Sequence, residues 1–138
     1  MTLAEFGIRV LIAAIAGILI GFERQWHHKE TGLRTNTLVS IGACIYVLLS
    51  FALTEKSGDV TRIIGQVVTG VGFLGAGIIF REGISVHGLT SAATIWCSSA
   101  IGCLAGAGFY VETLVTTVIV VLVNSIFEPL DKWLRNRK

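Results

Sequence analysis

Apolar residues run along this chain in five long segments, which short polar stretches separate. The segments are Phe6–Phe22, Thr35–Leu53, Ile63–Phe80, Leu89–Tyr110 and Thr113–Phe127. A helix needs about 20 residues to cross a hydrocarbon core of ~30 Å, so the short fifth segment is expected to extend toward Trp133. The pattern predicts an all-α polytopic membrane protein, with one domain over residues 1–138 that forms a bundle of about five transmembrane helices.

The composition supports this class. Apolar residues make up 53% of the 138 positions and charged residues only 14%, whereas soluble domains carry about 25% charged residues. The net charge of +2, without an aromatic-basic patch, does not indicate nucleic acid as a partner. The three cysteines lie inside apolar segments, so we expect no disulfide framework.

Lysine and arginine are distributed unequally between the two sides of the predicted bundle. If the N-terminus is outside, eight of the eleven fall on the inner side, namely Arg24, Lys29, Arg34, Arg81, Lys132, Arg135, Arg137 and Lys138. Lys56 and Arg62 remain outside, with Arg9 near the outer edge. Because positive residues stay on the cytoplasmic side, this distribution predicts an N-out, C-in orientation. The basic C-terminal residues are also expected to meet anionic membrane lipid.

Small residues recur at helical spacing in three segments. The first contains Ala13, Gly17 and Gly21, the fourth contains Gly102 and Gly106, and the third contains Gly65, Gly70, Gly72, Gly75 and Gly77. Such GxxxG-like packing lets helix backbones approach closely in lipid, either within one bundle or across a dimer. An alternative for the third segment is a locally broken helix whose free backbone groups line a site.

Charged residues gather at the segment ends. Glu5 and Arg9 are four positions apart and can pair on one helix face. On the inner side, Glu23 and Glu82 are placed to bind a hard cation such as Mg²⁺, which prefers carboxylate oxygens and retained waters. Alternatively, Arg24, Arg34 and Arg81 neutralise these carboxylates and cross-link the helix ends.

Histidine does not add a metal site by its spacing. His27 and His28 have no partner at the usual metal-ligand spacing, so the sequence does not indicate a soft-metal site. We find no nucleophile–base set, phosphate loop or catalytic metal pattern, and we expect no enzymatic activity and no cofactor other than a Mg²⁺ ion.

Three stretches carry a family resemblance: GILIGFERQW, TGLRTNTLVSIGA and GVGFLGAGIIFREGISVHGLTSAATIWCSSAIGCLAGAG. With them the chain resembles the MgtC/SapB family of bacterial inner-membrane proteins. The resemblance implies a multi-pass, five-helix domain in the inner membrane with a cytoplasmic C-terminus. It also implies a link to growth at low Mg²⁺, to virulence through survival inside macrophages, and to restraint of the F-type ATP synthase.

The resemblance assigns importance to particular positions. Glu82 in FREG and Cys97 in IWCSS match the family's functionally important Glu and Cys. Thr90 stands where the family's namesake carries Asn, and Asn36 stands where many members carry His. The namesake continues into a soluble cytoplasmic domain after its fifth helix, whereas this sequence ends at Lys138.

Two functional hypotheses follow from these features. In the first, the protein acts by helix–helix association, as a homodimer or with a membrane complex such as the F-type ATP synthase. Gly72, Gly75 and Cys97 would then form the contact surface, with Glu82 orienting the inner turn. In the second, the protein is a small ion conduit or a Mg²⁺-binding protein with a site at Glu23 and Glu82.

Overall fold

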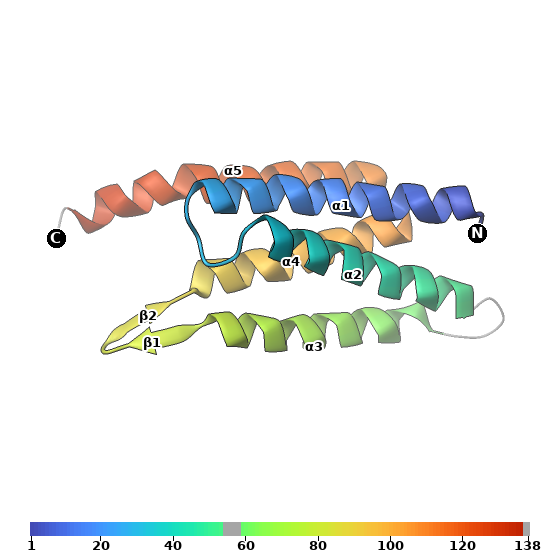
Figure 1. The fold of residues 1–138 in the computed structure, drawn as a ribbon, viewed down its shortest axis with the longest axis horizontal. Coiled ribbons are helices and arrows are strands. Elements are labelled where there is room, and N and C mark those ends of the chain that lie inside the picture. Colours follow the sequence, from blue (N-terminus) through green and yellow to red (C-terminus); the bar gives the residue numbers. More distant parts are fainter. Residues whose placement is uncertain (54–58, 137–138) are drawn as a thin grey trace.

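The computed structural model describes residues 1–53 and 59–136, apart from the side chain of Arg135. These residues form five α-helices and one β-hairpin (Figure 1). The elements are α1 (Leu3–Trp26), α2 (Leu33–Leu53), α3 (Val60–Ile78), β1 (Phe80–Glu82), β2 (Ser85–His87), α4 (Leu89–Ala107) and α5 (Tyr110–Arg135). By length and composition all five described helices can cross a membrane, which confirms the predicted all-α polytopic class. Lys56, Arg137 and Lys138 lie outside the described residues.

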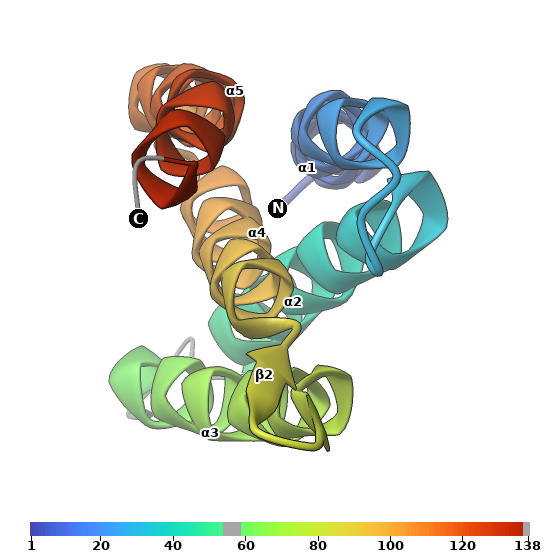
Figure 2. The same cartoon turned by 90° about the vertical axis from the view of Figure 1, so that its left-hand side faces the viewer.

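The helices lie along one long axis and alternate in direction, so that the N- and C-termini are at opposite ends (Figure 1). Helix α4 is central and packs against α1, α2, α3 and α5. Helix α3 packs chiefly on α4 and α2, and α5 packs chiefly on α1 and α4. In the end-on view α3 therefore lies on one side of the bundle, and α1 and α5 lie on the other (Figure 2).

Helices α1 and α5 are longer than the predicted apolar segments, because polar residues form their terminal turns and cap the start of α1. Thr2 and Glu5 form a capping box in which Thr2 N donates to Glu5 Oε2 (2.8 Å) and Glu5 N donates to Thr2 Oγ1 (3.2 Å). Arg9 donates through Nη1 to the carbonyl of Gly106 (2.8 Å), at the end of α4. The expected Glu5–Arg9 pair is thus replaced by a cap and an interhelical bond. Helix α5 reaches Arg135, which confirms the extension toward Trp133.

The segment between α3 and α4 is a two-stranded hairpin rather than the simple turn that the sequence indicated at Arg81 and Glu82. Phe80 pairs with His87 and Glu82 pairs with Ser85, which leaves a two-residue turn. Its first residue, Gly83, has φ 61°, as a type II′ hairpin turn requires. Helix α3 itself is continuous from Val60 to Ile78, so the structure excludes a broken helix within that range.

The small residues of α1 and α4 are packed against α2. A Cβ added to Gly17 would lie 2.7 Å from Thr37 Cα, and one added to Gly21 would lie 2.6 Å from Leu33 Cα. A Cβ on Gly102 would overlap the Ser40 carbonyl oxygen. These glycines are therefore needed for the close approach of α1 and α4 to α2.

Candidate functional site

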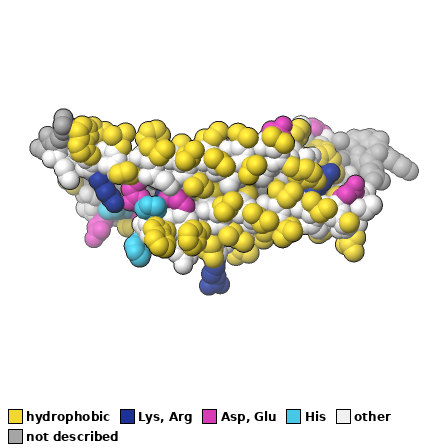
Figure 3. Space-filling view, turned by 90° about the horizontal axis from the view of Figure 1, so that it is seen from above, with side chains coloured by type: hydrophobic (Ala, Val, Ile, Leu, Met, Phe, Trp, Pro, Cys, Tyr) yellow, Lys and Arg dark blue, Asp and Glu magenta, His cyan; other side chains and the backbone are white. Residues whose placement is uncertain are grey.

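Polar side chains of several elements meet at one end of the bundle, which we call the hairpin end. It comprises the C-terminus of α1, residues 27–32, the N-terminus of α2, the hairpin, the N-terminus of α4 and the C-terminal part of α5. Figure 3 shows hydrophobic side chains along most of this face, a Lys or Arg side chain that projects from its edge near mid-length, and the histidines of this face toward the hairpin end. The predicted inner-side residues of the described chain lie at this end.

Arg24 forms the buried link between α1 and α4. Its side chain is 2% exposed, and Nη2 donates to Ser91 Oγ (2.8 Å). Ser91 Oγ donates in turn to Glu30 Oε2 (2.7 Å). This hydrogen bond from Ser91, with a backbone hydrogen bond of Glu30 itself, holds the pKa of the Glu30 carboxyl below its usual 4.5. The chain Arg24–Ser91–Glu30 therefore cross-links a helix end, a helix start and a loop.

Asn36 forms a second buried link, between α2 and α4. It is fully buried, and its Oδ1 accepts a hydrogen bond from Ser98 Oγ (2.8 Å). Its Nδ2 donates to the Gly32 carbonyl (2.9 Å) and, at 3.4 Å, to that of Thr31. Both sides of the amide are used, so Asn36 orients the loop and the start of α2 against α4.

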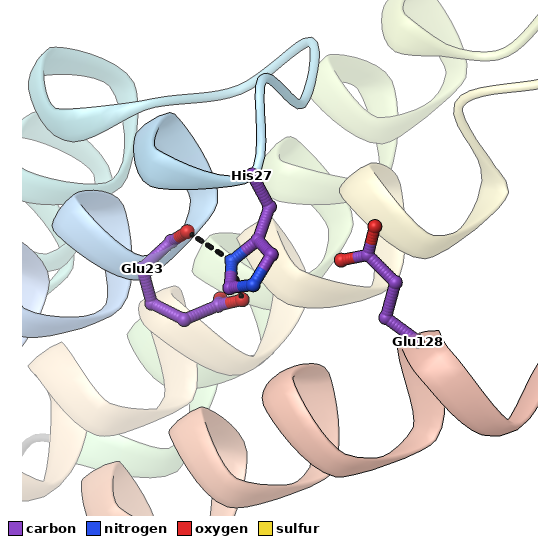
Figure 4. A group of neighbouring side chains, drawn as sticks. All are labelled: Glu23, His27 and Glu128. Carbon is purple, nitrogen blue, oxygen red and sulfur yellow. Dashed lines mark hydrogen bonds and ion pairs between the residues drawn. The ribbon is translucent and has the colours of Figure 1, made fainter.

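Glu23, His27 and Glu128 form a compact group between α1 and α5 (Figure 4). His27 Nδ1 lies 2.9 Å from the main-chain oxygen of Glu23 and 3.0 Å from its Oε1. One possible ligand atom from each of the three residues lies within 4.8 Å of the other two. Glu128 Oε1 also pairs with Lys29 Nζ (3.1 Å) and Lys132 Nζ (2.9 Å). The group thus combines two carboxylates, an imidazole and two ammonium groups.

The sequence missed His27 and Glu128 in this group. The spacing of Glu23 and His27, four positions along one helix, is a signal that could have identified that pair. The approach of Glu128 depends on how α5 packs against α1, which local spacing does not reveal. The prediction that His27 has no partner at metal-ligand spacing overlooked Glu23, and in the folded chain Glu23 and Glu128 each place a possible ligand atom within 4.8 Å of one on His27.

Glu82 is not part of this group. It is exposed at the end of β1, and the hairpin lies on the α3 side of the bundle, away from the end of α1 (Figures 1 and 2). Arg81 donates through Nε to the Gly83 carbonyl (2.7 Å) within the hairpin. The structure therefore does not assemble the Mg²⁺ site that the sequence suggested from Glu23 and Glu82.

The remaining predicted site residues are dispersed. Arg34 is exposed on α2, Cys97 is half-buried on α4, and Thr90 is exposed at the start of α4. Thr90 lines a cavity of about 270 Å³, together with Arg24, Lys29 and Glu128 among other residues. Gly72 is exposed on α3, and Gly75 is buried within the chain.

Comparison with known proteins assigns the chain to a family. A model of the MgtC family matches residues 10–133. The chain is 52% identical to an MgtC protein of Brucella abortus over 118 residues, which cover 86% of this chain and 49% of that one. It is 45% identical to an MgtC protein of Salmonella typhimurium over 124 residues, covering 90% of this chain and 53% of that one.

An uncharacterized protein of Synechocystis is 42% identical over 130 residues, 94% of this chain and 55% of that protein. The chain thus spans about half the length of the curated relatives it matches. No solved structure matches it. Because the family model covers nearly the whole chain, this multi-pass membrane protein belongs to the MgtC family.

Proposed function

We propose that this protein is a non-enzymatic protein of the bacterial inner membrane that acts in Mg²⁺ homeostasis by associating through α3 with a second copy of itself. Membership of the MgtC family supports the link to low-Mg²⁺ adaptation and to virulence. The excess of lysine and arginine at the hairpin end supports a cytoplasmic C-terminus. The observation that carries the association is the outward face of α3.

The outward face of α3 combines a large side chain with positions that have none. Phe73 is 83% exposed. A Cβ added to Gly70, Gly72 or Gly77 would meet no atom within 4 Å. Lipid provides no hydrophobic driving force between helices, so close backbone approach is what favours their association. The Phe73 ring and the flanking glycines are suited to pack against a partner helix.

Gln66 adds a polar group to the same face. It lies one helical turn before Gly70, is exposed, and its side-chain amide makes no hydrogen bond with the described residues. An amide in hydrocarbon is costly unless it finds a partner, and bonds of this kind between membrane helices contribute about 0.6–2 kcal/mol. A two-fold dimer places the two Gln66 side chains at the same depth, so this position supports self-association in particular.

The structure changes which residues the surface includes. Gly75 faces the Cβ of Ala92 on α4, 3.6 Å from an added Cβ, and so contributes to packing within the chain. We therefore assign the association surface to Gly70, Phe73 and Gly77, whose spacing places them on one face of α3 with Gln66, whereas Gly72 lies outside that face. Glu82 is exposed on the adjoining hairpin, where it is accessible to a partner.

Another membrane complex, such as the F-type ATP synthase, is the alternative partner for this surface. The second hypothesis from the sequence, a Mg²⁺-binding site or conduit at Glu23 and Glu82, has less support because these two side chains belong to separate parts of the hairpin end.

The experiment is a mass measurement of the protein in lipid nanodiscs, with leucine introduced at Gly70 or at Gly77, which share one face of α3. We expect the wild type to be a dimer and both variants to be monomers, because leucine would prevent the close approach of two α3 helices. Gly7→Leu is the matched control, since Gly7 on α1 also has open space around it and should leave the dimer intact. A monomeric wild type, or dimeric α3 variants, would refute self-association. Co-purification of a membrane complex that is lost in the same variants would indicate the alternative partner.

A further inference from the structure

Glu23 is a buried carboxylate with too few hydrogen bonds. Its side chain is 6% exposed, and neither carboxylate oxygen accepts a hydrogen bond from the described residues. His27 Nδ1 is 3.0 Å from Oε1, but the same nitrogen is 2.9 Å from the main-chain oxygen of Glu23, and one N–H cannot serve both well. Removing an ionised carboxylate from water is unfavourable unless a cation compensates for it. Apart from the His27 ring, no described side chain contacts the Glu23 carboxylate through a hydrogen bond or ion pair, so its oxygens remain available to a bound cation.

Glu128 leaves a second oxygen available at the same place. The two ammonium groups of Lys29 and Lys132 both contact its Oε1. Its Oε2 is buried and has no hydrogen-bond partner among the described residues. Arg24, the other buried cation nearby, directs its Nη2 to Ser91 rather than to either carboxylate. The lysine and arginine side chains nearby thus leave carboxylate oxygens of both Glu23 and Glu128 without a hydrogen-bond partner.

His27 is oriented as a metal ligand usually is. When Nδ1 donates its proton to the main-chain oxygen of Glu23, Nε2 carries the lone pair that can bind a metal ion. Metal-binding histidines typically donate their second ring N–H to a backbone carbonyl in this way.

The spacing of the three residues fits one shared ion after a small adjustment. Their ligand atoms lie within 4.8 Å of one another. Two ligands bound at about 2.1 Å to the same ion are at most about 4.2 Å apart. Side-chain rotations that turn Nε2 of His27 and the two carboxylates toward one another would therefore place all three around one ion, between the C-terminus of α1 and the C-terminal part of α5 (Figure 4).

The ligand types select the metal. Mg²⁺ and Ca²⁺ prefer oxygen ligands alone, whereas an imidazole with two carboxylates suits divalent transition metals such as Mn²⁺ and Zn²⁺. We infer that Glu23, His27 and Glu128 bind a divalent transition-metal ion that joins α1 to α5. A cavity of about 270 Å³, which Glu128 lines but Glu23 and His27 do not, lies on the α5 side of the group. This inference goes beyond the proposed function and does not depend on self-association.

The test is metal binding by the full chain in detergent, measured by calorimetry and by the visible absorption of Co²⁺. We expect one Zn²⁺ ion per chain, with weaker binding of Mn²⁺ and binding of Mg²⁺ at least roughly 100-fold weaker than that of Zn²⁺. His27→Ala and Glu23→Gln should each lower the Zn²⁺ affinity by roughly tenfold or more. Co²⁺ should give the absorption of a site with nitrogen and oxygen ligands.

His28→Ala is the matched control, because His28 is the exposed neighbour of His27 and its removal should leave the affinity unchanged. Gel filtration of each variant checks that it is folded, and Glu128→Gln provides a third ligand variant from a different helix. The inference is overturned if the wild type binds no Zn²⁺, or if the His27 and His28 variants behave alike. It is also overturned if Mg²⁺ binds as tightly as Zn²⁺, or if Co²⁺ shows the thiolate band of a cysteine site.

Discussion

Helices α3 and α4 have similar lengths and are both rich in small residues, yet they use them in opposite ways. Half of the apolar span of α4 is buried, whereas only 6% of that of α3 is buried. Gly102 and Gly106 of α4 are pressed against α2, and Ser98 is paired with Asn36. The glycines on the outer face of α3 have no neighbour within 4 Å. A small-residue pattern therefore identifies a helix that can be approached closely, but not which partner approaches it.

The same comparison separates the polar residues of the two helices. Those of α4, such as Ser91 and Ser98, are buried and bond to other elements. On α3, Thr69 bonds only to its own helix, at the Gly65 carbonyl (3.0 Å), and Gln66 is exposed. Helix α4 is thus the structural centre of the bundle, while α3 presents an outer surface.

The largest expected difference in the free energy of unfolding is between two single glycine-to-alanine variants, one in α4 and one in α3. Gly102→Ala should lower the free energy of unfolding by about 3 kcal/mol, because the new Cβ would overlap the Ser40 carbonyl and force α2 away from α4. Gly77→Ala should raise it by up to about 1 kcal/mol, since the methyl group has open space and alanine is the better helix former. Equilibrium unfolding in mixed detergent measures both changes. Equal changes at the two positions would abolish the distinction between the helices.

A smaller effect is expected from removing one hydroxyl group. Ser98→Ala should lower the free energy of unfolding by about 1–2 kcal/mol, because it leaves the buried Asn36 Oδ1 without its donor. Thr69→Val on α3 is the control, with an expected change within about 0.5 kcal/mol, since its hydroxyl bonds only to its own helix. The same unfolding measurement applies, and similar losses for both variants would show that the Ser98–Asn36 bond contributes little.

Much of the fold was predictable because lipid leaves few alternatives. Uncharged runs of membrane length can only be spanning helices, and the predicted fourth segment begins at Leu89, where α4 begins. The hairpin was missed because its residues are exposed, so no hydrophobic alternation indicates the strands. The extra length of α1 and α5 comes from polar terminal turns, which a count of apolar residues omits.

The candidate site was less predictable because it depends on which helices become neighbours. Glu23 was identified from its place at a helix end, but its companions differ from those expected. Glu82 has a similar place at the end of an apolar segment, yet the hairpin carries it to the α3 side. Glu128 reaches Glu23 and His27 only because α5 packs against α1. Residues so distant in sequence are brought together by tertiary packing, which local spacing cannot indicate.

The smallest effect is expected at Glu30, the loop residue that α4 holds through Ser91. Its folded-state pKa lies below 4.5, so the ionised carboxylate stabilises the fold above pH 4.5, and this contribution is lost as the pH falls through the lowered pKa. Glu30→Gln should therefore lower the free energy of unfolding at neutral pH, by no more than about 0.5 kcal/mol for so exposed a group. The wild-type and variant curves should converge as the pH falls through the lowered pKa of Glu30.

Glu82→Gln is the matched control for Glu30→Gln, because Glu82 is exposed on β1 at the end of α3. Its unfolding curve should follow that of the wild type across the same pH range. Because Ser91 retains its hydrogen bond from Arg24 in Glu30→Gln, the difference between the two variants isolates the part of the stability that α4 gains through the loop carboxylate. If the free energies of unfolding of the Glu30 and Glu82 variants depend on pH in the same way, the hydrogen bond from Ser91 to Glu30 does not stabilise the fold. The stabilising polar contacts of α4 would then be those with the other helices.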